Sequence, residues 1–183
     1  MTSPGRALTL HEDRLFSSDP TQRAIARRLY AQVAALPIVS PHGHTDPAWF
    51  AGNDPFANAT ELLLVPDHYV FRMLYSQGVP LDALGIPRTD GSRGEGDPRA
   101  AWRVFAQNFH LFRGTPSSMW LNHVFHDVFG LRTRLDASTA DAYYDEITGA
   151  LQTPQFRPRA LFERFNIELI ATTEGPLDPL AHH

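Results

Sequence analysis

Cysteine is absent from the 183 residues of this sequence. Disulfide bonds and thiolate metal sites are therefore excluded, so any transition metal has to be held by His, Asp or Glu side chains. The chain also has no apolar run long enough to cross a bilayer, and its first residues lack the apolar segment of a secretory signal peptide. The absence of a membrane-spanning run and of a signal peptide predicts a cytoplasmic protein.

The sequence also lacks a large net charge of either sign. The 16 Lys and Arg residues stand against 20 Asp and Glu residues, and the basic residues are scattered along the chain. Nucleic acids bind to clustered basic surfaces, so no nucleic acid is expected as a partner, and no membrane either. The hydrophobic share of 43% and the length are sufficient for a globular domain with its own core.

Capping residues followed by proline mark the starts of several helices, and apolar residues then recur at helical spacing. The expected helices cover residues 20–35, 61–64, 68–77, 98–113, 116–129, 139–151 and 158–166. Four aromatic side chains on these helices are expected in the core, namely Trp102, Phe105, Phe109 and Trp120. The middle of the chain is therefore predicted to be strongly helical.

Only two segments are typical of strands, residues 36–40 and 167–171. Each is short and apolar, which predicts burial, and each leads into a polar loop. In a parallel α/β architecture the ligands bind at the carboxyl ends of the strands, so the two loops are where a site is expected. Two strands cannot close a barrel. A fragment of a larger barrel fits this pattern better than a free-standing helical domain.

His42 and His44 follow the first expected strand and flank Gly43. In an extended segment, side chains two positions apart point the same way, so two imidazoles can face one ion while glycine lets the backbone pass closely. Neutral imidazole suits Zn²⁺, Mn²⁺ or Fe²⁺. Neighbouring histidines can equally be ordinary polar groups. A pair is also an incomplete catalytic metal site, because three protein ligands are usual.

A second group of polar side chains comprises Asp67, His68, Tyr69 and Arg72. An acid, an imidazole, a phenol and a guanidinium within six residues could bind a sugar acid and move a proton. The alternative, which spacing alone favours, is that Asp67 caps a helix, Tyr69 packs and Arg72 is a solvated charge.

A further candidate is the set His123, His126 and Asp127 on one expected helix. The spacing allows a metal-binding face. Large apolar residues flank all three positions, however, so packing is the favoured interpretation.

Five segments, taken in order, resemble the successive motifs of uronate isomerases, also called glucuronate isomerases, of the amidohydrolase superfamily. They are SPHGHTDP, PDHYVFRML, MWLNHVFHDVFG, STA and ATTEGPLDPLAHH, and the similarity spans about residues 22–183. The resemblance implies an α/β fold, the N-terminal portion of a (β/α)₈ TIM barrel of metal-dependent hydrolase type with a mainly helical insertion after strand 1. The chain is then one partial domain. Its expected parts are an N-terminal helical segment (1–36), barrel strand 1 with the metal-binding loop (37–47), the helical insertion (48–166) and strand 2 with the start of the next helix (167–183).

The resemblance implies an aldose–ketose isomerase of hexuronate catabolism, which converts D-glucuronate to D-fructuronate and D-galacturonate to D-tagaturonate. His42 and His44 would be the metal ligands of strand 1, with zinc as the first choice and manganese or iron as alternatives. Tyr69 would move or polarise a proton, His68 would hold a substrate oxygen, and Arg72 matches a basic position of the family. The third ligand, an Asp after the last barrel strand, would lie outside these residues, so the fragment is expected to be inactive alone.

Two other functions stay open. One is a metal-dependent hydrolase of the same superfamily, and the other is a non-catalytic truncated module. Assembly into a homo-oligomer is open as well. The chain also departs from the family pattern, because Glu174-Gly175 replaces the usual Asp-Asp and Pro66 replaces a glycine. The preferred hexuronate is therefore left open.

Overall fold

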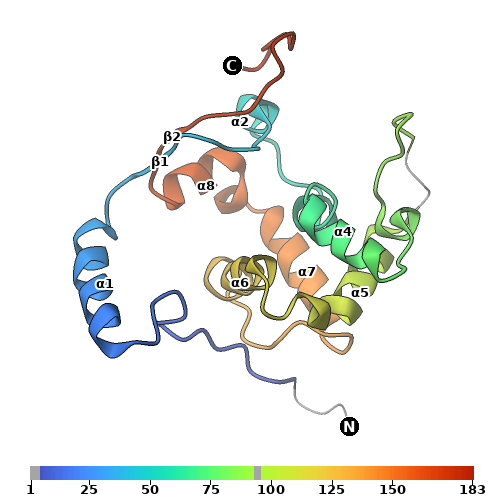
Figure 1. Cartoon of the computed structure of the whole chain (residues 1–183). Helices are drawn as coiled ribbons and strands as arrows, with labels where there is room; N and C mark the ends of the chain where they lie inside the picture. The colour runs from blue at the N-terminus through green and yellow to red at the C-terminus, as the bar shows by residue number, and fades with distance from the viewer. Residues whose placement is uncertain (1–4, 93–95) are drawn as a thin grey trace. The chain divides into compact units, whose positions relative to one another are not determined.

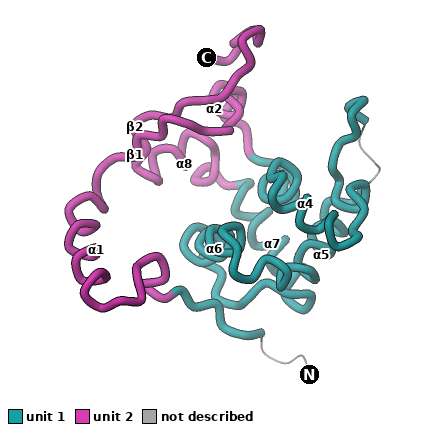
Figure 2. The backbone as a smooth tube through the Cα atoms, in the orientation of Figure 1, with its two compact units in different colours: residues 1–10, 56–152 teal, residues 11–55, 153–183 magenta. Residues whose placement is uncertain are grey.

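The computed structural model describes residues 5–92 and 96–183 of the chain (Figure 1). Its backbone divides into two compact units, residues 1–10 with 56–152 and residues 11–55 with 153–183 (Figure 2). We call the first the helical unit and the second the strand unit. Within the described ranges, no helix is long and apolar enough to cross a membrane.

The strand unit contains a two-stranded parallel sheet, one helix of 14 residues and shorter helices. Its elements are α1 (Pro20–Val33), β1 (Ile38–Ser40), α2 (Pro47–Gly52), the 3₁₀ turn η4 (Pro154–Phe156), α8 (Pro158–Arg164) and β2 (Ile167–Ile170). Strand β1 pairs with β2 in parallel, with Ser40 opposite Ile170. The two strands expected from the sequence are therefore confirmed, although they are more than a hundred residues apart in the chain.

The expected burial of these strands is wrong. Ile38, Val39 and Leu169 are 49%, 57% and 49% exposed. Helix α8 packs against β2, but a sheet of two strands offers little further cover for its apolar side chains. Helix α1 also leaves its apolar side chains exposed, since it has the expected apolar spacing but no buried residue. The strand unit therefore presents a large apolar surface.

Among its described residues, the regular secondary structure of the helical unit consists of helices and one isolated bridge. Its elements are α3 (Ala59–Leu63), α4 (His68–Ser76), η1 (Leu81–Leu84), α5 (Pro98–Asn108), η2 (Phe109–Phe112), α6 (Pro116–His123), the π-helical turn η3 (Val124–Val128) and α7 (Ala140–Leu151). Each expected helix in this region is found, but the helix expected over 98–113 continues as the 3₁₀ turn η2 after Asn108, and the one expected over 116–129 continues as η3 after His123. The helix starts follow the capping residues and prolines seen in the sequence. At α5, for example, Asp97 accepts the backbone N–H of Arg99 at 3.0 Å just before Pro98.

The core of the helical unit is aromatic. Trp102 on α5 is fully buried, contacts Phe105 at a ring-centroid distance of 5.2 Å, and donates from Nε1 to the carbonyl oxygen of Ala140 on α7 at 3.0 Å. Tyr143 on α7 is also buried, and burial raises the pKa of its hydroxyl. Rings of this size contribute roughly 2–3 kcal/mol each when they are removed from water. The expected core positions Trp102, Phe105 and Phe109 are thus confirmed.

Candidate functional site

The loops that follow β1 and β2 lie side by side at the carboxyl ends of the two strands. The N–H of Ala171 donates to the carbonyl oxygen of Ser40 at 2.8 Å, and Thr173 Oγ1 donates to the carbonyl oxygen of Gly43 at 2.8 Å. A Cβ atom at Gly43 would lie 2.9 Å from the carbonyl oxygen of Ala171. Glycine is therefore required at this position, because the second loop passes too closely for any side chain.

His42 and His44 point toward each other within the first of these loops. Their Nε2 atoms are 3.0 Å apart and their ring centroids are 4.8 Å apart. Two nitrogen ligands of one tetrahedral zinc ion, each at roughly 2.0–2.1 Å, would lie about 3.3 Å apart. The pair therefore fits one divalent ion when both rings carry their proton on Nδ1 and present Nε2 lone pairs.

Two other polar side chains of these loops, Asp46 and Glu174, already have partners. Asp46 caps α2 by accepting the N–H of Ala48 at 2.9 Å. Glu174, which replaces an Asp of the family pattern, lies 3.2 Å from His183 Nε2. The hydroxyl of Thr45 is buried and has no hydrogen-bond partner within the described chain. The described residues contain no group of three His, Asp or Glu side chains arranged to hold a metal.

The second candidate group lies at the start of α4 in the helical unit. Asp67 Oδ1 accepts the N–H groups of Tyr69 at 2.8 Å and Val70 at 3.3 Å, so its expected capping role is confirmed. The rings of His68 and Tyr69 lie 4.2 Å apart at 34°. Tyr69 is 69% exposed. The expectation that Tyr69 packs is therefore wrong, because its side chain, including the hydroxyl, is accessible from solvent.

Arg72, one helical turn after His68, is exposed, as are His68 and Tyr69. The structure thus groups His68, Tyr69 and Arg72 on the exposed side of α4, while Val70 and Leu74 are buried on the other. His42 and His44 belong to the strand unit and this second group to the helical unit. That the two groups share one site stays a prediction.

A cavity of about 590 Å³ adjoins Tyr69, and the sequence did not indicate it. Its lining consists of Tyr69, Met73, Phe112, Thr115, Pro116, Ser117 and Trp120. Trp120 was expected in the core, which is wrong, since it is 38% exposed. Helix α6 buries Leu121 instead, and a helix of only eight residues carries too little periodicity to show which neighbour is buried.

The set on α6 and the following π-helical turn is held together internally. The two carboxylate oxygens of Asp127 lie 2.7 Å from His123 Nδ1 and 2.6 Å from His126 Nδ1. One acid therefore serves both imidazoles. Phe125 between them is fully buried, as the packing interpretation of this segment requires.

Comparison with known proteins assigns the chain to a family. The profile of the family described as glucuronate isomerase matches residues 11–183. A uronate isomerase of Xanthomonas euvesicatoria pv. vesicatoria is 79% identical over 176 residues, which are 96% of this chain and 37% of that protein. A uronate isomerase of Phenylobacterium zucineum is 67% identical over 178 residues, again 37% of its length.

Two solved structures are similar as well. The crystal structure of glucuronate isomerase from Caulobacter crescentus matches with a TM-score of 0.93 at 66% identity, covering 97% of this chain and 37% of the other. Uronate isomerase from Thermotoga maritima matches with a TM-score of 0.80 at 28% identity, over 95% and 35% of the two chains. The chain therefore spans a little over a third of the relatives that it matches.

Fold and loops define an α/β protein in which a pair of imidazoles lies at the carboxyl end of a parallel strand pair. The chain belongs to the glucuronate isomerase family. The resemblance seen in the order of its sequence motifs is thereby confirmed.

Proposed function

We propose that the natural protein is a uronate isomerase that interconverts D-glucuronate and D-fructuronate, and D-galacturonate and D-tagaturonate, in hexuronate catabolism. The observation that carries this proposal is the match to glucuronate isomerases over residues 11–183. The reaction moves a proton between C2 and C1 of the open-chain sugar through an enediol, so it needs a group that moves protons and a group that stabilises negative charge on oxygen.

We assign the metal site to His42 and His44. The 3.0 Å separation of their Nε2 atoms and the close approach that Gly43 permits support this assignment. A divalent ion, with zinc as first choice and manganese or iron as alternatives, would supply Lewis-acid stabilisation of a substrate oxygen when bound. The third ligand is expected to be an Asp outside these residues.

Tyr69 is proposed to move or polarise the proton, and His68 to hold a substrate oxygen. Both side chains are exposed and adjacent, and Asp67 fixes the helix turn that carries them. Arg72 supplies a guanidinium one turn further on, which suits the carboxylate of a uronate. The cavity beside Tyr69 offers apolar walls for the carbon skeleton.

The strand unit is proposed to be the beginning of a (β/α)₈ barrel. Its two parallel strands carry apolar residues that are about half exposed, and apolar surface of this kind is stable in water only when other elements cover it. Further strands and helices of a barrel would provide that cover. The cytoplasmic location expected from the sequence stays a prediction.

The proposal is tested by following the conversion of D-glucuronate to D-fructuronate by the natural protein. His42→Ala and His44→Ala should each abolish metal-dependent turnover. His11→Ala is the matched control, because His11 is exposed in the same unit and its Nδ1 atom accepts the backbone N–H of Asp13 at 3.0 Å. Undiminished turnover in both site variants would refute the ligand assignment, and no turnover of either hexuronate by the natural protein would refute the function.

A polypeptide of these 183 residues alone is expected to show no turnover. The resemblance assigns the third metal ligand to a position outside them, and the described residues offer no third ligand in its place. Measurable conversion of D-glucuronate by this polypeptide would contradict the assignment.

A further inference from the structure

The N-terminal segment of the helical unit pairs with the chain that follows the π-helical turn. Ala7 forms an isolated antiparallel bridge with Thr133, and the N–H of Arg134 donates to the carbonyl oxygen of Arg6 at 2.7 Å. In this register Arg6 and Arg134 are directly opposite each other on one face. Like charges that face each other across two strands destabilise the pairing unless something neutralises them.

This pairing is fixed from several sides. The hydroxyl of Tyr143 donates to the carbonyl oxygen of Thr133, and Thr139 Oγ1 donates to that of Arg134 at 2.8 Å. Leu8 is buried. The two arginines therefore cannot move apart by shifting their backbones without breaking these hydrogen bonds.

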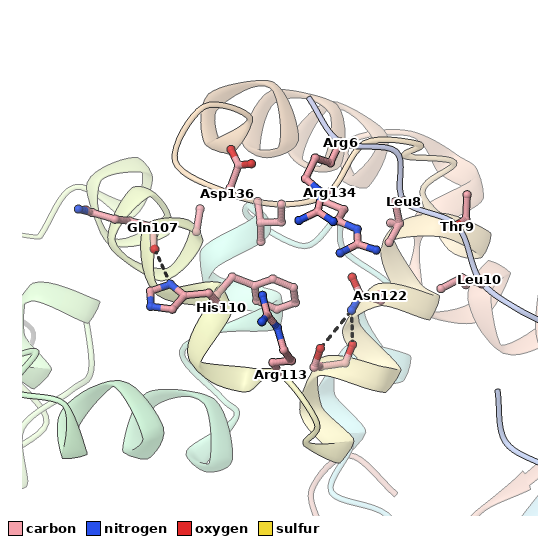
Figure 3. A pocket seen from close by; sticks show the side chains of 14 residues that line it. Arg6, Leu8, Thr9, Leu10, Gln107, His110, Arg113, Asn122, Arg134 and Asp136 are labelled. Atoms are coloured by element: carbon pink, nitrogen blue, oxygen red, sulfur yellow. Dashed lines mark hydrogen bonds between the residues drawn. The ribbon is translucent and has the colours of Figure 1, made fainter. Parts of the chain in front are cut away.

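A third guanidinium lies across a cavity of about 320 Å³ from this pair. Figure 3 shows Arg6 and Arg134 reaching into the cavity from one wall and Arg113 from the opposite wall, with Asn122 close by. Arg113 follows η2 in a tight turn that is completed by Gly114 at φ 79°. We call this cavity the arginine pocket.

The arginine pocket carries excess positive charge. Asp136 is the one acid among the described residues that line it, and its Oδ1 already accepts the N–H and the hydroxyl of Ser138, at 2.8 and 2.6 Å. Arg134 donates from Nε to the carbonyl oxygen of Ala7 at 3.3 Å. Within the described chain, neither Arg6 nor Arg113 forms an ion pair with a carboxylate. All three arginine side chains are exposed, so their guanidinium groups are accessible to an anionic ligand.

We infer that the arginine pocket binds a small organic anion that carries a carboxylate or phosphate group. The planar guanidinium fork matches either group with two parallel hydrogen bonds. Leu8, Phe109 and Leu135 line the same cavity and can contact a carbon skeleton. The volume is at the lower end of ligand pockets, which suits a molecule the size of a six-carbon acid or a sugar phosphate. None of the residues proposed for catalysis lines this pocket.

The test is calorimetric titration of the natural protein with two probes, inorganic phosphate and succinate, in dilute buffer that contains no hexuronate, because a hexuronate is itself a six-carbon acid and could fill the arginine pocket. Arg113→Gln and Arg134→Gln should each weaken binding roughly tenfold, the effect of losing one charge-assisted hydrogen bond. Arg28→Gln is the matched control, since Arg28 is exposed on α1 and does not line the pocket. The probe that binds more tightly identifies the phosphate or the carboxylate as the recognised group.

Two results would overturn the inference. One is the absence of saturable binding of either probe at millimolar concentration. The other is a loss that is the same in Arg28→Gln as in Arg113→Gln, which would indicate unspecific attraction by net charge. Arg113→Lys keeps the charge but removes the fork, so it should bind with intermediate affinity. It also carries the test if a glutamine variant fails to fold. The outcome is independent of whether the isomerase activity itself is found.

Discussion

Replacing Gly43 by alanine perturbs the proposed metal site without touching a ligand. The added Cβ would lie 2.9 Å from the carbonyl oxygen of Ala171, closer than side-chain carbons approach backbone oxygens. The neighbour is backbone, so the two loops have to separate. Overpacking of this kind costs about 1–3 kcal/mol. Separation also strains the 2.8 Å hydrogen bond from Thr173 to Gly43, which is worth roughly 1 kcal/mol.

Because His42 and His44 flank this glycine, Gly43→Ala should weaken metal binding by about 10–100-fold, as loss of supporting contacts does at other metal sites. Metal affinity is measured by letting the protein compete with a metal-sensitive dye for the ion, and stability is measured by urea unfolding. Gly149→Ala is the control, and it should raise the stability of the protein where Gly43→Ala lowers it. Gly149 lies in α7 with open space around it, so alanine there should stabilise the helix by roughly 0.5–1 kcal/mol. Unchanged metal affinity and stability in Gly43→Ala would refute the close approach of the loops.

Three further outcomes are expected. Tyr69→Phe should lower kcat by about 10²–10⁴ with metal content unchanged, and a wild-type rate would exclude Tyr69 as the proton-moving group. Trp102→Phe removes the bond to the carbonyl oxygen of Ala140 and should cost about 1–3 kcal/mol in urea unfolding, whereas a cost below roughly 0.5 kcal/mol would contradict the packing described. The hydrogen bond from the Ser138 hydroxyl lowers the pKa of Asp136. The stabilisation from this hydrogen bond is present above the unfolded pKa of about 3.9 and is lost as the pH falls through the lower folded pKa. Asp136→Asn should therefore make the midpoint of urea unfolding less dependent on pH in the acid range. A pH dependence equal to that of the wild type would count against this hydrogen bond.

Helix starts could be predicted from the sequence because their signals are local. Asp19 accepts the N–H of Gln22 at 2.8 Å directly before Pro20, and Asp97 repeats the arrangement before Pro98. Both contacts join residues two or three positions apart, so no other part of the fold is needed to form them.

Burial could not be predicted in the same way, because it depends on what packs against a segment. Val39 has the apolar sequence context of a buried strand but is 57% exposed, since the sheet has two strands in the described chain. The predicted burial of Trp120 was wrong for a related reason, because α6 is short and buries the neighbouring residue Leu121 instead. Side-chain exposure at Tyr69 was likewise decided by the packing of Val70 and Leu74 beneath it.

The candidate site was predicted in its parts. His42 and His44 face each other as their spacing suggested, and Gly43 lies where the backbone passes closely. The arginine pocket could not be seen in the sequence, because Arg6, Arg113 and Arg134 come from three segments that only the fold brings together.

Anomalous diffraction at the zinc edge from crystals of the natural protein tests the proposed metal site most directly. We expect one peak about 2.0–2.1 Å from Nε2 of both His42 and His44, and its disappearance in His44→Ala. Crystals of active isomerase that show no metal at these two nitrogens, or a metal bound elsewhere, would contradict the assignment.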